Sequence, residues 1–163
     1  MSAEFSEDRV YRYKLTREWG GPNGNLVVVG LNPSTADETV DDPTIRRCIG
    51  FAKREGMSGL VMVNLFALRA TDPGYMKLHQ FPISHPDQVH ECDKHICLSL
   101  PNGKIVAAWG VHGHHRDRDM EVRRMIANRG RKLYHLGLTK GGYPKHPLYL
   151  RGDSPLVEWT DAV

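Results

Sequence analysis

Apolar residues occur along this chain in short continuous runs, and a glycine, proline or polar residue follows each run. The runs lie at residues 26–30, 60–65, 104–109 and 133–138. Runs of this length without alternation are typical of strands that are buried on both faces of a parallel sheet. Segments with helical spacing of apolar positions separate them. The pattern predicts a three-layer α/β/α sandwich with a central, mainly parallel four-stranded sheet.

The predicted helices span residues 43–55, 87–100 and 119–128. Asp42 is expected to be the N-cap of the first helix, with Pro43 in its first turn. The third helix is basic and amphipathic, and Arg123, Arg124 and Arg129 are expected to point outward from it.

Residues 10–19 alternate and are rich in aromatic side chains, which predicts a strand at an edge of the sheet. The turn-forming residues 20–25 follow, so this strand and strand 26–30 are predicted to form an N-terminal hairpin. We see no repeat and no linker that divides the chain. Residues 1–163 are therefore predicted to form a single domain.

Composition narrows the class of protein. Hydrophobic residues make up 40 % of the chain and charged residues 25 %, which is ordinary for a globular protein. No apolar run approaches the length of a membrane helix, and the N-terminus has no secretory signal pattern, so we expect a cytoplasmic protein without membrane contact. The three cysteines fit reduced thiols better than disulfides or a four-cysteine metal site.

The charges are unevenly distributed. Residues 104–151 contain eleven Lys and Arg against three Asp and Glu, a local net charge of +8, whereas the whole chain carries +3. One interpretation is a solvated helix with many arginines. The other is a surface that faces the phosphates of a nucleic acid.

Unusual polar segments follow the predicted parallel strands. Because ligands bind outside the carboxyl ends of such strands, these segments are expected to share one functional edge. They are Gly30–Pro33, Asn64–Phe66, Trp109–Gly110 and Gly142–Pro147. Nucleophile, P-loop and dinucleotide motifs are absent from the sequence. His112, His114 and His115 suggest a metal site, but no further ligand motif supports one, so we predict neither metal nor cofactor.

The residues at this edge suit a particular chemistry. Asn32, held in front of Pro33, can fix one water, and His146 can donate to an oxygen that gains negative charge. Asn64 can pair with the edge of a planar heterocycle, and Phe66 can stack on it. These parts suit the cleavage of a bond whose leaving group is a heterocyclic anion. Structural roles stay open: Asn32 as a turn residue, Asn64 as a partner of loop backbone and Phe66 as core.

Two motifs are similar to those of the uracil-DNA glycosylase superfamily. Gly30-Leu31-Asn32-Pro33-Ser34 resembles its first motif, Gly-x-(Asp/Asn/Ala)-Pro, and His146-Pro147-Leu148 resembles its last, His-Pro-Ser. The whole chain most closely resembles a bacterial and phage family known only as domain of unknown function 1643. That resemblance includes the segments Asp41–Thr44 and Pro144–Tyr149.

The superfamily resemblance implies roles for individual residues. Asn32 would hold the hydrolytic water and His146 would stabilise the departing base. The base would lie against Gly30, Leu31, Pro33, Ser34, Asn64 and Phe66. DNA phosphates would be bound by Arg69, Arg116, Arg118, Lys145 and Tyr149.

The function expected from this resemblance is base excision. The protein would be a DNA glycosylase that hydrolyses the N-glycosidic bond of a damaged or modified pyrimidine, on an extrahelical base in duplex or on single-stranded DNA. We expect it to act as a monomer. The alternatives are a non-catalytic nucleic-acid- or nucleotide-binding module of the same fold, and a hydrolase of free nucleosides or nucleotides.

Overall fold

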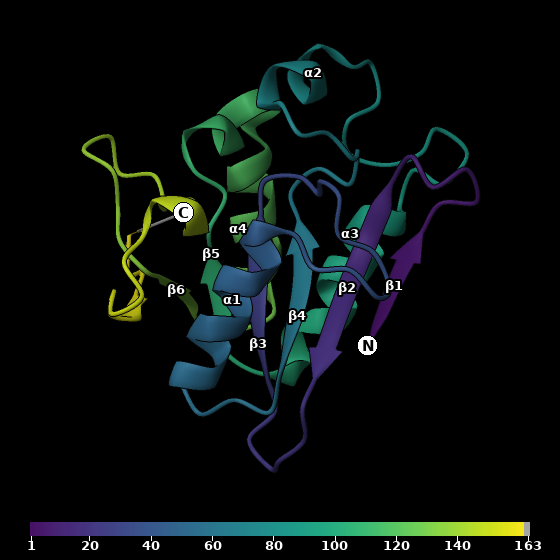
Figure 1. Ribbon diagram of the computed structural model, residues 1–163. Coiled ribbons are helices and arrows are strands. Elements are labelled where there is room, and N and C mark those ends of the chain that lie inside the picture. The colour runs from purple at the N-terminus through teal and green to yellow at the C-terminus, as the bar shows by residue number, and fades with distance from the viewer. Residues whose placement is uncertain (162–163) are drawn as a thin grey trace.

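The computed structural model describes residues 1–161, except for the side chain of Asn102. A seven-stranded mixed sheet forms its centre, in the order β1-β2-β4-β3-β5-β6-β7 (Figure 1). The strands are β1 (Ser2–Phe5), β2 (Arg12–Glu18), β3 (Asn25–Gly30), β4 (Gly59–Asn64), β5 (Ile105–Ala107), β6 (Leu133–His135) and β7 (Val157–Glu158). The helices are α1 (Pro43–Arg54), α2 (Pro73–Leu78), α3 (Glu91–Ser99) and α4 (Arg118–Asn128). Short 3-10 segments are η1 (Leu100–Asn102), η2 (Val111–Asp117) and η3 (Pro147–Tyr149).

The four central strands β4, β3, β5 and β6 run parallel, as the continuous apolar runs predicted. The complete sheet is larger and mixed, because β1 and β2 on one side and β7 on the other pair antiparallel to their neighbours. These three outer strands are short or alternate in polarity, which is typical of strands with one solvated face.

Helices cover both faces of the sheet (Figure 1). On one face α1 packs through an apolar cluster that includes Ile45, Phe51 and Met62. On the other face α3 and α4 pack through a larger cluster that includes Ile96 and Ile126. Alternation along β3 and β4 assigns Val28 and Met62 to the α1 face and their neighbours to the α3/α4 face. The predicted three layers are therefore present.

The predicted hairpin between residues 10–19 and 26–30 is wrong. Strand β4 lies between β2 and β3, and it pairs antiparallel with β2 and parallel with β3. The N-terminal hairpin is formed instead by β1 and β2. The turn signal at residues 20–25 only reverses the chain, and the β3–α1–β4 crossover then inserts β4 between the two strands.

Two helix predictions need adjustment. The second helix begins at Glu91 rather than at residue 87. Arg123 does not point outward from α4: its side chain is buried, and Cζ lies 3.9 Å from the centre of the Trp159 ring. Asp42 is the N-cap of α1 as predicted, because its side chain accepts a hydrogen bond from the N–H of Ile45. No helix within residues 1–161 has the length and apolar character of a membrane-spanning segment.

A β-bulge in β2 reverses which side chains face α1. The pairing with β1 steps from Glu4–Lys14 to Phe5–Arg12, so Tyr13 is an extra residue on β2. Leu15 belongs to the core cluster on the α1 face, whereas Tyr13 belongs to the cluster on the α3/α4 face. The bulge places Arg12 on the same side of the sheet as α1, the opposite of what strict alternation predicts.

Candidate ligand-binding site

A cavity of about 720 Å³ lies at the carboxyl ends of the parallel strands, on the α1 face of the sheet. Its floor comes from positions of three adjacent strands that point to this face: Gly30 of β3, Met62 and Asn64 of β4, and Ala108 after β5. The first turn of α1, the loop after β3 and the segment around η3 form its walls. Its volume is in the range of small-molecule binding sites.

Gly30 makes room for the amide of Asn64. A Cβ added at residue 30 would lie 2.7 Å from Asn64 Oδ1 and 2.6 Å from Met62 Cε. The backbone conformation of Gly30 is open to any residue, since its φ is not in the positive region. A larger residue here would have to displace the ends of these two side chains, so space and not conformation favours glycine.

Asn64 is the least satisfied polar group of the cavity. Its side chain belongs to a residue that is 2 % exposed, and neither Oδ1 nor Nδ2 has a hydrogen-bond partner among the described residues. Each buried polar group left unsatisfied costs about 1–3 kcal/mol. The predicted alternative, that Asn64 satisfies loop backbone, is not what the structure shows. Its amide therefore lines the cavity with both its donor and its acceptor unpaired among the described residues.

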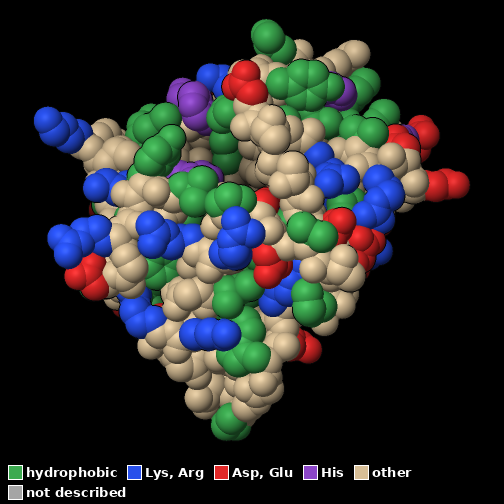
Figure 2. Space-filling view, viewed as in Figure 1, with side chains coloured by type: hydrophobic (Ala, Val, Ile, Leu, Met, Phe, Trp, Pro, Cys, Tyr) green, Lys and Arg blue, Asp and Glu red, His purple; other side chains and the backbone are tan. Residues whose placement is uncertain are grey.

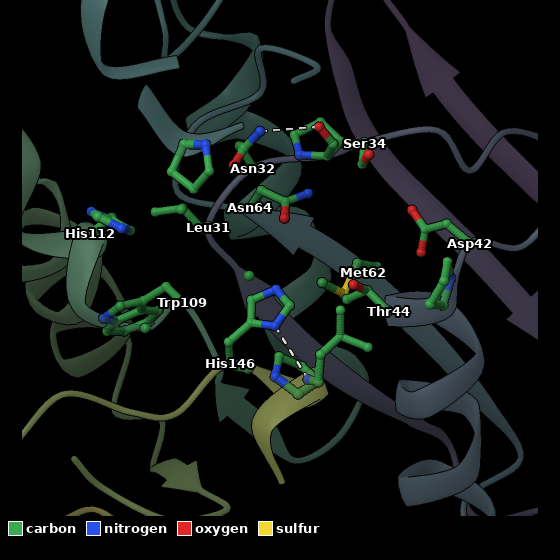
Figure 3. Close-up of a pocket in the computed structure, with 18 of the residues that line it drawn as sticks. Leu31, Asn32, Ser34, Asp42, Thr44, Met62, Asn64, Trp109, His112 and His146 are labelled. Atoms are coloured by element: carbon green, nitrogen blue, oxygen red, sulfur yellow. Dashed lines mark hydrogen bonds between the residues drawn. The ribbon is translucent and has the colours of Figure 1, made fainter. Parts of the chain in front are cut away.

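Asn32 lies on the cavity wall above Asn64 (Figure 3). Its Nδ2 donates to the carbonyl of Ala70 at 2.8 Å, and at longer distances to the carbonyls of Pro33 and Leu68. Three carbonyl acceptors around one nitrogen fix the orientation of the amide. Oδ1 is left as an acceptor without a partner among the described residues. Asn32 therefore anchors the loop at residues 68–70 and presents one oriented oxygen.

His146 enters the cavity from the opposite wall (Figure 3). Its Nδ1 accepts a hydrogen bond from the N–H of Leu148 at 3.2 Å, which caps η3. Burial lowers the pKa of His146, and Asp42 opposes this shift. A neutral ring that accepts at Nδ1 carries its proton on Nε2, and Figure 3 shows Nε2 on the side of the ring toward Asn64. His146 is thus a neutral hydrogen-bond donor.

A polar wall of the cavity was not predicted. It contains Arg12 of β2 and Asp42 and Thr44 from the start of α1. The sequence predicts Asp42 as the N-cap of the helix, and it does not reveal Arg12, because alternation along a regular strand assigns Arg12 to the other face of the sheet. The opposite wall is apolar, with Leu31 and Trp109, and His112 lies beside Trp109 (Figure 3).

The structure brings many of the predicted site residues together. Those that line the cavity are Gly30, Leu31, Asn32, Pro33, Ser34, Asn64, Lys145, His146 and Tyr149. Tyr149 is 83 % exposed at the rim, and its ring lies edge-on to His146 at 5.9 Å between centres.

Four other predicted residues lie elsewhere. Phe66 is fully buried in the core cluster on the α3/α4 face, which agrees with the alternative prediction that it is a core residue. Arg118 is 1 % exposed, and it donates to the carbonyl of Leu65 and pairs with Asp93 and Glu121. Arg116 donates to the carbonyls of His79 and Gln80. Arg69 lies in a neighbouring shallow hollow, with its Nε bonded to the carbonyl of Ser34.

The basic stretch at residues 104–151 does not form one surface. α4 packs on the face of the sheet opposite to α1 and the cavity, and Arg118 and Arg123 are buried. Figure 2 instead shows Lys and Arg side chains spread over the face that α1 covers. Arg46 and Arg47 of α1 and Lys145 contribute to the charge on this side.

Within residues 1–161, no three His, Cys, Asp or Glu side chains are grouped so that they could hold a metal ion. His112 and His114 instead have other neighbours. His112 Nδ1 lies 3.4 Å from Lys77 Nζ, and the ring of His114 lies 5.6 Å from that of Tyr143.

The structure thus defines an α/β protein with a ligand-sized cavity at the carboxyl ends of its parallel strands, and Asn64 is the polar side chain at the cavity floor. The chain belongs to the family described as protein of unknown function (DUF1643), whose model matches residues 12–148. This match spans the cavity from Arg12 to Leu148. Neither the curated proteins nor the solved structures contain a significant match to the chain.

Proposed function

We propose that this protein binds a pyrimidine-type base of DNA in the cavity and hydrolyses its N-glycosidic bond. The observation that carries the proposal is the buried amide of Asn64, which has no partner among the described residues and lies at the cavity floor. A primary amide presents a donor and an acceptor side by side. The matching ligand is a planar group with an adjacent acceptor and donor, as on the pairing edge of a pyrimidine.

The groups around Asn64 support a hydrolytic step. Asn32 Oδ1 accepts a hydrogen bond from a water, which attacks C1′ of the sugar as the bond from C1′ to the base nitrogen breaks. The bonding electrons leave with the base, and the proton of the water passes to the base or to solvent. His146 donates from Nε2 to the base oxygen that gains negative charge. The resemblance of the two sequence motifs to those of the uracil-DNA glycosylase superfamily supports the same assignment.

A second hollow beside the cavity favours a polymer over a free nucleoside. It is lined by Arg9, Arg69 and Tyr75, and it shares Ser34, Ala70 and Thr71 with the main cavity. Arg9 is paired with Glu38, so Arg69 is the guanidinium of this hollow that can bind a phosphate, and the exposed ring of Tyr75 can stack on a base. A strand that places one nucleotide in the cavity would continue along this hollow.

Base release from a panel of DNA tests the proposal. Purified protein is incubated with duplexes and single strands that carry uracil or a modified pyrimidine, and freed bases are identified by mass spectrometry. We expect release of a free base by the natural protein. His146→Ala should slow it on the order of 10²–10³-fold. Arg124→Gln is the matched control, because Arg124 is exposed on the far face of the sheet.

The alternative function is a binding module without turnover. The three hydrogen bonds of Asn32 to backbone carbonyls favour it, since they give this residue a structural role that does not depend on catalysis. Binding of pyrimidine DNA by the natural protein with no base released from any substrate would establish this alternative. Loss of DNA binding in Asn64→Ala would then still show that the base binds at the floor of the cavity.

A further inference from the structure

We propose that the polar wall of the cavity, through Arg12 and Thr44 together with the neighbouring Ser34, is a subsite for the phosphate of the bound nucleotide. The inference rests on the proposed function only for the identity of the nucleotide. The phosphate subsite itself follows from the side chains of this wall, and it is tested separately below.

Arg12 is a buried guanidinium with unused donors. Its residue is 2 % exposed and lines the cavity, yet only Nη1 has a hydrogen-bond partner among the described residues, the carbonyl of Ala36 at 3.1 Å. Nε is buried without a partner. The other arginines buried to this degree have several partners: Arg17 pairs with Asp41, and Arg118 pairs with Asp93 and Glu121. Arg12 has no ion pair among the residues described.

The charges around Arg12 leave room for an anion. Arg12 and Arg69 are both without an ion pair in the described part of the chain, and Asp42 is the carboxylate that acts on Arg12. Asp42 is already used for backbone, because its oxygens accept from the N–H groups of Ile45 and Ala36. Burial lowers the pKa of Arg12 to about 10, so the group keeps its charge at neutral pH. A ligand anion would compensate this buried charge.

The β-bulge aims Arg12 at this wall. In a regular strand of the same sequence, alternation from Leu15 would place Arg12 on the α3/α4 face, away from the cavity. Bulges next to binding sites commonly redirect a side chain in this way. A bulge disrupts the hydrogen-bond ladder of a strand pair locally, and a ligand bound by the redirected guanidinium would offset this loss.

Neutral donors complete the subsite. The hydroxyls of Thr44 and Ser34 line the same cavity, and neither has a hydrogen-bond partner among residues 1–161. Thr44 is in the first turn of α1, a helix of twelve residues whose N-terminus favours negative charge. Figure 3 shows Ser34, Asp42 and Thr44 together on one side of Asn64, opposite Leu31 and Trp109. A base over Asn64 would thus have its phosphate on the Arg12 side.

Calorimetric titration with inorganic phosphate at constant ionic strength tests the subsite. We expect the natural protein to bind phosphate and Arg12→Met, which keeps the length of the side chain, to weaken binding at least tenfold. Thr44→Val keeps shape and helix but removes the hydroxyl, and it should weaken binding several-fold. This second variant decides the matter if Arg12→Met does not fold. Arg46→Gln removes a charge from the same helix outside the cavity and should change nothing.

Two further ligands separate this inference from the proposed function. Deoxyuridine should bind the natural protein more weakly than its 5′-monophosphate, and Arg12→Met should abolish the difference. Asn64→Ala should weaken the binding of deoxyuridine and leave the binding of inorganic phosphate unchanged. A short oligonucleotide with an internal deoxyuridine tests the source of the phosphate. If Arg12→Met binds this oligonucleotide more weakly than the natural protein does, the subsite binds a phosphodiester. If Arg12→Met weakens binding of the monophosphate alone, the subsite binds a free phosphate monoester. Absence of phosphate binding in the natural protein, or binding that survives both Arg12→Met and Thr44→Val, overturns the subsite.

Discussion

The backbone of Gly30 and the side-chain amide of Asn64 occupy adjoining positions on neighbouring parallel strands, with no space between them for a further carbon. The two residues are direct partners in the β3–β4 register. A Cβ at residue 30 would approach Asn64 Oδ1 to 2.7 Å. The absence of a side chain at Gly30 therefore determines where the amide of Asn64 can lie.

Replacing Gly30 by alanine should displace Asn64 and Met62. We expect a loss of stability of about 1–3 kcal/mol, because the added methyl overfills a packed site, together with a loss of pyrimidine binding. Urea unfolding and titration with deoxyuridine measure the two effects. Gly50→Ala is the control: this glycine is exposed within α1 and has open space around a Cβ, so alanine should stabilise by about 0.5–1 kcal/mol. Normal deoxyuridine binding by Gly30→Ala would contradict the role of this contact.

Replacing Asn32 by alanine should affect both the loop and the reaction. It removes the donor that three carbonyls share, which should cost about 1–3 kcal/mol of unfolding free energy. Base release should fall below detection while DNA affinity stays close to that of the natural protein. Asn32→Asp keeps an oxygen but removes the donor and adds a charge next to these carbonyls, so it should be the less stable of the two. Base release at the natural rate by Asn32→Ala would contradict the placing of the water.

The protein should lose stability as the pH falls. Burial lowers the pKa of His146 below its ordinary value of 6.5, so the unfolded chain binds more protons than the folded one beneath that pH. The contribution of His146 is complete above about pH 6.5 and is lost as the pH falls through the lowered pKa. Urea unfolding between about pH 8 and about pH 5 should show this slope.

His146→Asn provides the matched variant for this titration, because asparagine keeps an acceptor near the N–H of Leu148 and cannot be protonated. The slope should become smaller but not vanish, since burial also lowers the pKa of His112, His115 and His135. An unchanged slope would show that His146 titrates as it does in the unfolded chain.

Two of the three thiols should be inert in the folded protein. Cys48 and Cys92 are buried, and burial raises their pKa values to about 12 and about 11. A thiol-specific reagent at mildly alkaline pH should modify only Cys97 rapidly, as this residue is partly exposed. All three should react after unfolding in urea. Rapid modification of two or three thiols in the native protein would show that α1 or α3 does not pack as described.

The sequence predicts the parallel core well because its signals are local. The runs that became β3, β4 and β5 are continuous and apolar, and Asp42 with Pro43 marks the start of α1 unambiguously. The same logic brought Asn32, Asn64 and His146 to one edge, since carboxyl ends of parallel strands coincide. The pairing partner of β2 could not be predicted, because a turn signal does not reveal whether a later strand inserts between two earlier ones.

Arg12 shows a second limit. Its place in the cavity depends on a single extra residue in the β1–β2 ladder, and periodicity along residues 10–19 contains no mark of it. The unsatisfied amide of Asn64 is likewise a property of its surroundings, as the residue type alone does not tell whether loop backbone will reach it. In the basic stretch, Arg118 forms an ion pair with Asp93 and Arg123 packs on the ring of Trp159, so neither arginine is available to a partner.

The insertion of β4 between β2 and β3 has a consequence for the newly made chain on the ribosome. Residues 19–58 separate β2 from the strand against which it pairs in the sheet interior. At about 5–20 residues per second, β2 waits roughly 2–9 seconds after its own synthesis before β4 is complete. During that interval Tyr11 and Tyr13 have no core to enter, and only β1 is present to pair with β2. The N-terminal strands are thus made first but join the central sheet only through β4, and the cavity wall that contains Arg12 forms only after Met62 and Asn64 of the floor have been made.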